Sequence, residues 1–125
     1  MKKIFLLYSI STLLLTFASC TSNKEEVLYK DENKNGCDTS NVTFSGEVTT
    51  IFKNNCYVCH SGNSPLGGIK LDEYGPALIQ VNNGRLLGSI KFEKGYVSMP
   101  EGAAKLTDCQ IAKIEAWIND GAKNN

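Results

Sequence analysis

The clearest alternation of apolar and polar positions lies near the C-terminal end of the chain. Thr107 followed by Gln110 forms a capping box there, and Gly121 is a natural stop about one helix length later. Between them, apolar residues recur three and four positions apart, the spacing of one helix face: Ile111, Ile114 and Ile118, with Trp117 beside them. The pattern predicts an amphipathic helix whose apolar face, including Trp117, packs in the core.

Three shorter helices are expected upstream. Ser45 can cap the first, which ends near Asn55, Pro76 suits the first turn of the second, which ends near Val81, and the third spans Arg85–Phe92. Apolar residues share a face in the first and the third: Val48, Ile51 and Phe52, then Leu86 and Ile90. Gly, Pro, Ser and Asn mark 61–68 as a loop, and Gly95, Pro100 and Gly102 mark 93–105 as another. No segment alternates as a strand would, so we expect an all-α domain of three to five helices.

The N-terminal residues have the character of an export signal. Lys2 and Lys3 precede an apolar run, Ile4–Phe17, which is shorter than the roughly 20 residues that span a bilayer. The next residues, Phe17-Ala18-Ser19-Cys20, resemble a bacterial lipobox, in which Leu is commoner than Phe at the first position. We therefore expect a signal peptide at 1–19 and lipidation of Cys20. An ordinary secretory cleavage is the alternative, although the bulky Phe17 fits it poorly.

The polar, charged stretch 20–40 is predicted to be a tether, and 41–125 the folded domain. As a flexible coil the tether would span roughly 20–25 Å, which keeps the domain near a bacterial membrane, on the periplasmic or outer side. The chain has 13 basic and 13 acidic residues, and removal of Lys2 and Lys3 leaves 11 basic against 13 acidic, or −2. Because no stretch forms a basic stripe, nucleic acid is not an expected partner.

The stretch Cys56-Tyr57-Val58-Cys59-His60 has the most specific chemistry in the chain. It matches C-x-x-C-H, the attachment pattern of a c-type haem. Two thiols on one turn of backbone can add across the two vinyl groups of one porphyrin, and His60 can then bind the iron as proximal ligand. A zinc half-site and a dithiol redox pair are the alternatives for the same residues.

The remaining cysteines suggest a disulfide. Of the five cysteines, Cys20 is assigned to lipid and Cys56 with Cys59 to haem, which leaves Cys37 and Cys109. An even remainder in an exported, oxidising setting predicts a bridge, worth about 4 kcal/mol in the chain-entropy model. Two free buried thiols are the alternative.

Met99 is the predicted second iron ligand. His60 is the only histidine, and the only other methionine, Met1, leaves with the signal peptide. Met99 lies in a Gly- and Pro-containing loop, and Pro100 helps to hold such a loop because its ring fixes φ. A thioether ligand favours the reduced metal. Simple core filling is the alternative for a single methionine.

These motifs together resemble class I cytochromes c over about 43–122. Three further matches resemble the small planctomycete-type cytochrome c domain: Gly67-Gly68-Ile69-Lys70-Leu71-Asp72, Met99-Pro100, and Trp117-Ile118-Asn119-Asp120-Gly121-Ala122. The resemblance implies a helical fold around one covalent haem c, held by Cys56 and Cys59, with His60 and Met99 as axial ligands. It also implies that the first and last helices cross in a tight contact, with Phe52 facing Ile114, Trp117 and Ile118. Val48 stands where the family often has Gly, so a wider or shifted crossing is expected.

Weaker expectations concern the polar groups around the cofactor. Lys70, Tyr74 and Arg85 could bind haem propionates, against a plain surface role for each. The loop at Ser64-Pro65 could offer a carbonyl to the second nitrogen of His60. The N–H of Trp117 could reach a propionate, although a packing role is favoured.

The function expected from this sequence is one-electron transfer, without enzyme activity of its own. A monomer would meet redox proteins in transient contacts, either alone or as a subunit of a larger oxidoreductase. One alternative is a haem sensor or peroxidase-like subunit with a labile Met99, in which Glu93 or Glu101 would act as acid or base. A structural zinc module would draw on Cys37, Cys56, Cys59, Cys109 or His60, but only one C-x-x-C pair is present. A thiol–disulfide oxidoreductase would need alternating strands and helices that the chain lacks.

Overall fold

The structure is a computed structural model that describes residues 36–125. The predicted signal peptide, Cys20 and most of the predicted tether lie outside these described residues. Within them, the helices are all too short or too polar to cross a membrane.

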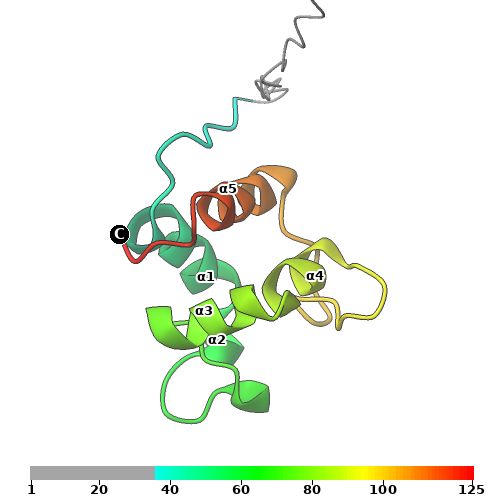
Figure 1. Cartoon of the computed structure of the whole chain (residues 1–125). Coiled ribbons are helices and arrows are strands. Elements are labelled where there is room, and N and C mark those ends of the chain that lie inside the picture. The colour runs from blue at the N-terminus through cyan, green and yellow to red at the C-terminus, as the bar shows by residue number, and fades with distance from the viewer. Residues whose placement is uncertain (1–35) are drawn as a thin grey trace, which may run out of the picture. The chain divides into compact units, whose positions relative to one another are not determined.

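Residues 36–125 form helices and no strand, which confirms the all-α class. The elements in chain order are the π-helix η1 (Phe44–Val48), α1 (Thr49–Asn55), α2 (Tyr57–His60), the 3-10 helix η2 (Leu66–Gly68), α3 (Tyr74–Asn82), α4 (Arg85–Lys91) and α5 (Asp108–Asn119). Figure 1 shows α1 and α5 in one part of the domain and the loop after α4 projecting from another. Helix α4 packs against both α3 and α5, and α5 packs against η1.

The first helix begins earlier than predicted. Its N-cap is Thr43, whose Oγ1 accepts the Gly46 N–H at 3.1 Å, so Ser45 lies inside the helix and is not its cap. Glu47 Oε2 accepts the Thr43 N–H at 3.0 Å and completes a reciprocal cap. The C-terminal residue adds to this cap, because Asn125 accepts the N–H groups of Phe44 and Ser45, both at 2.9 Å. Several backbone N–H groups at the start of the helix therefore have hydrogen-bond acceptors.

The core lies where α5 meets the first helix. Val48, Phe52, Ile114 and Trp117 are almost completely buried. The ring of Trp117 lies 5.5 Å from that of Phe44, which is in turn 5.2 Å from the ring of Tyr74. Helix α5 packs against η1, the N-terminal part of this first helix.

Helix α5 has the predicted boundaries. Thr107 Oγ1 accepts the Gln110 N–H at 3.2 Å and Gln110 Oε1 accepts the Thr107 N–H at 3.0 Å, so the capping box is confirmed. The helix ends at Asn119, and Gly121 follows with a φ of 93°. The Nε1–H of Trp117 donates to the Lys123 carbonyl at 2.8 Å, so Trp117 is a packing residue and its N–H is not directed to a propionate.

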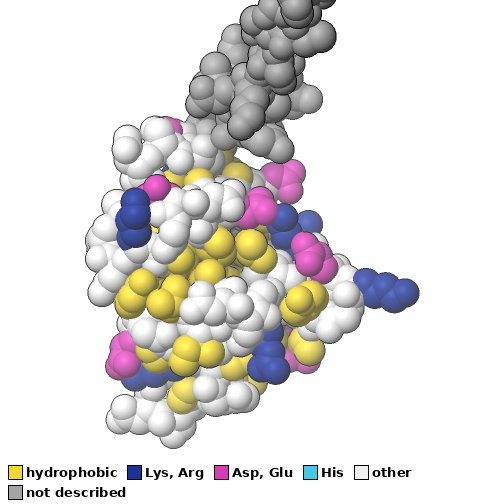
Figure 2. All heavy atoms as spheres, viewed as in Figure 1, with side chains coloured by type: hydrophobic (Ala, Val, Ile, Leu, Met, Phe, Trp, Pro, Cys, Tyr) yellow, Lys and Arg dark blue, Asp and Glu magenta, His cyan; other side chains and the backbone are white. Residues whose placement is uncertain are grey.

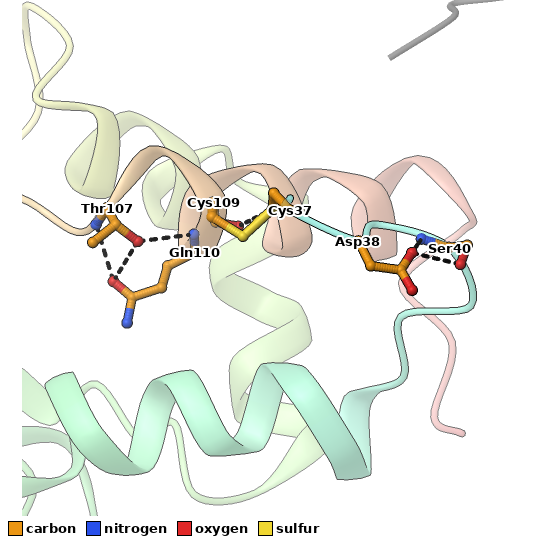
Figure 3. The surroundings of a disulfide bond; sticks show 6 residues. All are labelled: Cys37, Asp38, Ser40, Thr107, Cys109 and Gln110. Carbon is orange, nitrogen blue, oxygen red and sulfur yellow. Dashed lines mark hydrogen bonds between the residues drawn. A yellow bond between two sulfur atoms is a disulfide. The ribbon is translucent and has the colours of Figure 1, made fainter. Parts of the chain in front are cut away.

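A disulfide joins Cys37 to Cys109, with 5.5 Å between the Cα atoms. Figure 3 shows Cys37 in an extended segment that runs beside α5, and Cys109 in the first turn of that helix. After Cys37, the Asp38 carboxylate accepts the N–H and the O–H of Ser40 at 2.8 and 2.6 Å. The bridge therefore connects the start of the described chain to the same helix that packs on η1.

Candidate functional site

A cavity of about 680 Å³ lies between α2, α4 and the loop at 93–105. Cys56, Cys59, His60 and Met99, the four residues assigned to the cofactor, all line it. Most of the other lining side chains are apolar: Leu66, Ile69, Leu71, Leu86, Ile90, Val97 and Leu106 among them. Its size falls within the roughly 300–1,000 Å³ of ligand and cofactor sites.

The helix break at Cys56 brings the two thiols and the imidazole together. Cys56 closes α1 with a φ of −124° and starts the single turn α2. Its carbonyl accepts the N–H groups of Cys59 and His60 at 3.1 and 2.9 Å. Both cysteines are free thiols. The turn therefore presents two thiols and one imidazole to the same cavity.

The ring of His60 is oriented by the backbone of the following loop. Its Nδ1 lies 3.1 Å from the Ile69 carbonyl oxygen. A carbonyl can only accept, so Nδ1 carries a proton, and in the neutral imidazole Nε2 then keeps a free lone pair. The carbonyl expected from Ser64-Pro65 is thus supplied by Ile69 instead. The Leu71 N–H donates to the His60 carbonyl at 2.8 Å and closes the loop from the other side.

Met99 reaches the cavity from the loop that follows α4. Its N–H donates to the Ser89 carbonyl at 3.0 Å, and its peptide bond to Pro100 is cis. Because Ser89 belongs to α4, this hydrogen bond connects the Met99 backbone directly to a helix. The structure therefore brings the predicted thioether to the cavity that holds the predicted imidazole.

Only one of the three predicted propionate contacts lines the cavity. Arg85, at the start of α4, does so. Lys70 instead pairs with Glu73, with 2.6 Å between Nζ and Oε1. The Tyr74 hydroxyl donates to the Ala122 carbonyl at 2.9 Å, and its ring packs on Phe44. Lys70 and Tyr74 thus have other partners and lie outside the cavity lining, whereas Arg85 lines the cavity.

Several exposed apolar side chains that were not predicted as site residues surround the cavity. Val58 is 99% exposed, Leu66 and Val97 are each 63% exposed, and Tyr96 is 40% exposed, yet all four line the cavity. On the face drawn in Figure 2, hydrophobic side chains likewise reach the surface as a group across its middle. Exposed apolar groups that gather in this way mark a binding surface. Their sequence signal is a large apolar residue inside a loop, where no helix face explains it.

Burial changes the ionisation of the Cys56 thiol. Burial raises the pKa of the Cys56 thiol to about 11. Redox-active C-x-x-C pairs instead lower the pKa of a thiol, because the thiolate is the nucleophile. Cys56 is thus a neutral thiol at physiological pH.

The described residues do not form a zinc centre. Cys37 and Cys109 are bonded to each other and so cannot bind metal as thiolates. Between residues 36 and 125, no group of three or more His, Cys, Asp or Glu side chains is arranged to hold a metal ion. The geometry of the described residues therefore does not favour the zinc alternative to haem attachment.

No protein-family model, curated protein or solved structure matches this chain.

Proposed function

We propose that this protein is a one-electron carrier with a single covalent haem c and the fold of a small class I cytochrome c. The observation that carries the proposal is the convergence of Cys56, Cys59, His60 and Met99 on one largely apolar cavity. Cys56 and Cys59 would hold the porphyrin covalently through their sulfur atoms, and the His60 imidazole and the Met99 thioether would bind the iron. When bound, the haem supplies an iron that alternates between the ferrous and ferric states.

The surrounding residues fit a haem in three ways. His60 has Nε2 free to bind metal, because Nδ1 donates to the Ile69 carbonyl. The exposed side chains of Val58, Leu66, Tyr96 and Val97 offer apolar surface that a flat, apolar macrocycle would cover. A porphyrin that buries on the order of 300–400 Å² of apolar surface would contribute roughly 8–10 kcal/mol before entropy costs. Arg85 offers a guanidinium that can pair with a propionate.

The protein residues would also set the preferred oxidation state. An apolar lining disfavours the extra positive charge of the ferric state, since few dipoles are present to solvate it. The Met99 thioether acts in the same direction. We expect a potential well above that of a haem with two imidazole ligands, and electron exchange through transient contacts with redox proteins.

The proposal also covers the location and the partners of the protein. The protein would be exported and attached to a bacterial membrane through lipid on Cys20, with 20–40 as the tether. It would act as a monomer or as a subunit of a larger oxidoreductase. A haem sensor or peroxidase-like subunit is the second candidate, because Glu101, beside Met99, lines the cavity as its one carboxylate among the described residues. Rapid carbon monoxide binding to the wild-type ferrous protein would favour that candidate.

The test is production of the full chain in a bacterium that can mature c-type cytochromes. Coloured protein whose haem survives acid–acetone extraction, and whose mass rises by one haem, is the expected result. Cys56→Ala with Cys59→Ala should abolish that covalent attachment, whereas Cys37→Ala with Cys109→Ala should keep it. A colourless wild-type protein with the mass of the polypeptide and lipid alone would refute the proposal.

A further inference from the structure

A tyrosine in the Met99 loop lies lengthwise against α4. A Cβ built on Gly88 would lie 2.5 and 2.6 Å from Cγ and Cε2 of Tyr96, and closer still to Cδ2. A Cβ built on Gly84 would lie 3.3 Å from the Tyr96 hydroxyl oxygen. Real Cβ atoms do not approach other atoms within 3.0 Å, so the ring occupies space that exists only because Gly88 has no side chain.

The backbone of the same loop is bound to the same helix. The Glu93 N–H donates to the Gly88 carbonyl at 2.9 Å, and the Tyr96 N–H donates to the Glu93 carbonyl at 3.2 Å. The Met99 N–H then donates to the Ser89 carbonyl at 3.0 Å. Gly88 and Ser89 thus hold both ends of the segment Glu93–Met99, and the Tyr96 ring packs on α4 between these two attachments.

The rest of this segment offers little that could hold it in place. Gly95 has a φ of 98°, Val97 is 63% exposed, and Lys94 and Ser98 are exposed. Gly88, in contrast, is buried within α4. The contact between Gly88 and Tyr96 is therefore the main side-chain attachment of the segment to the helix.

We propose that Tyr96, seated on Gly88, is a positioning residue for Met99. The inference rests on the proposed function, in which Met99 binds the iron. A thioether is a weak ligand, so the fraction of time that it stays on the metal depends on how firmly its loop is held. The contact between Tyr96 and Gly88 sets that fraction without touching the iron ligand itself.

Gly88→Ala in the haem-loaded full chain tests the inference, with Gly75→Ala as the matched control. Both glycines lie in helices without a positive φ, but a Cβ on Gly75 would meet nothing within 4 Å. Overpacking at Gly88 should raise the population with Met99 off the iron about 10-fold, which corresponds to about 1.4 kcal/mol. The Gly75 variant should leave this population at the wild-type value.

The readouts are the weak far-red absorption that marks sulfur–iron ligation in class I cytochromes c, and the rate of carbon monoxide binding to the ferrous protein. Gly88→Ala should weaken the far-red absorption and raise the rate of carbon monoxide binding about 10-fold, in proportion to the population of haem iron without Met99 bound. Tyr96→Ala should behave as Gly88→Ala. In a Tyr96→Ala background, Gly88→Ala should add nothing further.

The outcomes separate the two proposals. A wild-type protein without the far-red band contradicts Met99 ligation, which belongs to the proposed function, and the positioning role falls with it. A wild-type protein with the band, together with Gly88→Ala and Tyr96→Ala variants that keep wild-type carbon monoxide rates, overturns the positioning role alone. If Gly88→Ala does not fold, Tyr96→Ala decides, because it removes the ring without adding volume to α4.

Discussion

Removal of the disulfide between Cys37 and Cys109 should cost a large part of the stability of the domain. The bridge joins residues 72 apart in sequence, so it closes a loop that contains the helices from η1 to α4 and the whole candidate site. For a loop of this length, the lost chain entropy of the unfolded state corresponds to about 4 kcal/mol at 25 °C. That is a large fraction of the roughly 5–15 kcal/mol that small domains have.

The assay is guanidinium chloride unfolding of the haem-loaded domain, comparing wild type with Cys37→Ala plus Cys109→Ala. Trp117 fluorescence follows the core, because this side chain is 1% exposed and changes environment on unfolding. The midpoint should fall by roughly 1–2 M, and the dependence on denaturant should steepen because the unlinked chain exposes more surface. Dithiothreitol should reproduce this shift in the wild type, since it reduces a disulfide but leaves thioethers intact.

The same reductant supplies the control, because it should leave the double variant unchanged. Visible spectra before unfolding establish that the haem site is intact in both proteins. A drop of less than about 1 kcal/mol with intact spectra would refute the reasoning, because the unfolded chain would then be as restricted without the bridge as with it.

Three further predictions concern single residues. Met99→Ala should leave the protein coloured but abolish the far-red band. It should also lower the reduction potential and allow fast carbon monoxide binding. A variant that keeps the band would show that Met99 is not the ligand. Trp117→Ala should cost about 3–5 kcal/mol in denaturant unfolding, because it removes a buried ring and leaves the Lys123 carbonyl without its donor, and a loss below about 1 kcal/mol would contradict this packing role. The hydrogen bond from the Thr43 backbone lowers the pKa of Glu47 from its usual 4.5, so its contribution is present above that pH and is lost as the pH falls through the folded-state value. The free energy of unfolding of Glu47→Gln should therefore fall less than that of the wild type as the pH is lowered. An equal fall in both proteins would count against a role of Glu47 in the cap.

Capping chemistry shows how far the helix boundaries can be predicted. The start of α5 is predictable because Thr107 and Gln110 satisfy each other within four residues of sequence. The start of the first helix is harder, since Thr43 and Ser45 are both good caps. Thr43 is the cap because its Oγ1 accepts the Gly46 N–H. This contact needs a glycine at position 46, since a Cβ there would lie 2.6 Å from that oxygen.

The candidate site shows a similar division. Cys56, Cys59, His60 and Met99 could be named because their chemistry is specific and the chain has few alternatives to them. The carbonyl partner of His60 could not be named, because it depends on the path of a loop in which Gly62, Gly67 and Gly68 all have positive φ. Such turns reverse the chain in ways that residue types alone do not specify.

Competing partners, one distant and one local, occupy two of the three residues expected to bind propionates. Tyr74 donates to the Ala122 carbonyl, a partner 48 residues away. Nothing local in the sequence indicates this pairing, whereas Lys70 is satisfied by Glu73, only three residues on. A polar side chain near a cofactor motif is thus a poor predictor of a cofactor contact until its competing partners are known.

The acceptor that orients His60 is a main-chain oxygen, and this has a consequence for how the protein can evolve. Every amino acid at position 69 brings the same carbonyl, so point substitutions there can vary the apolar wall while the imidazole keeps its tautomer. Insertions or deletions between His60 and Ile69 would move that oxygen, so selection should act on the length of this loop more strongly than on its composition.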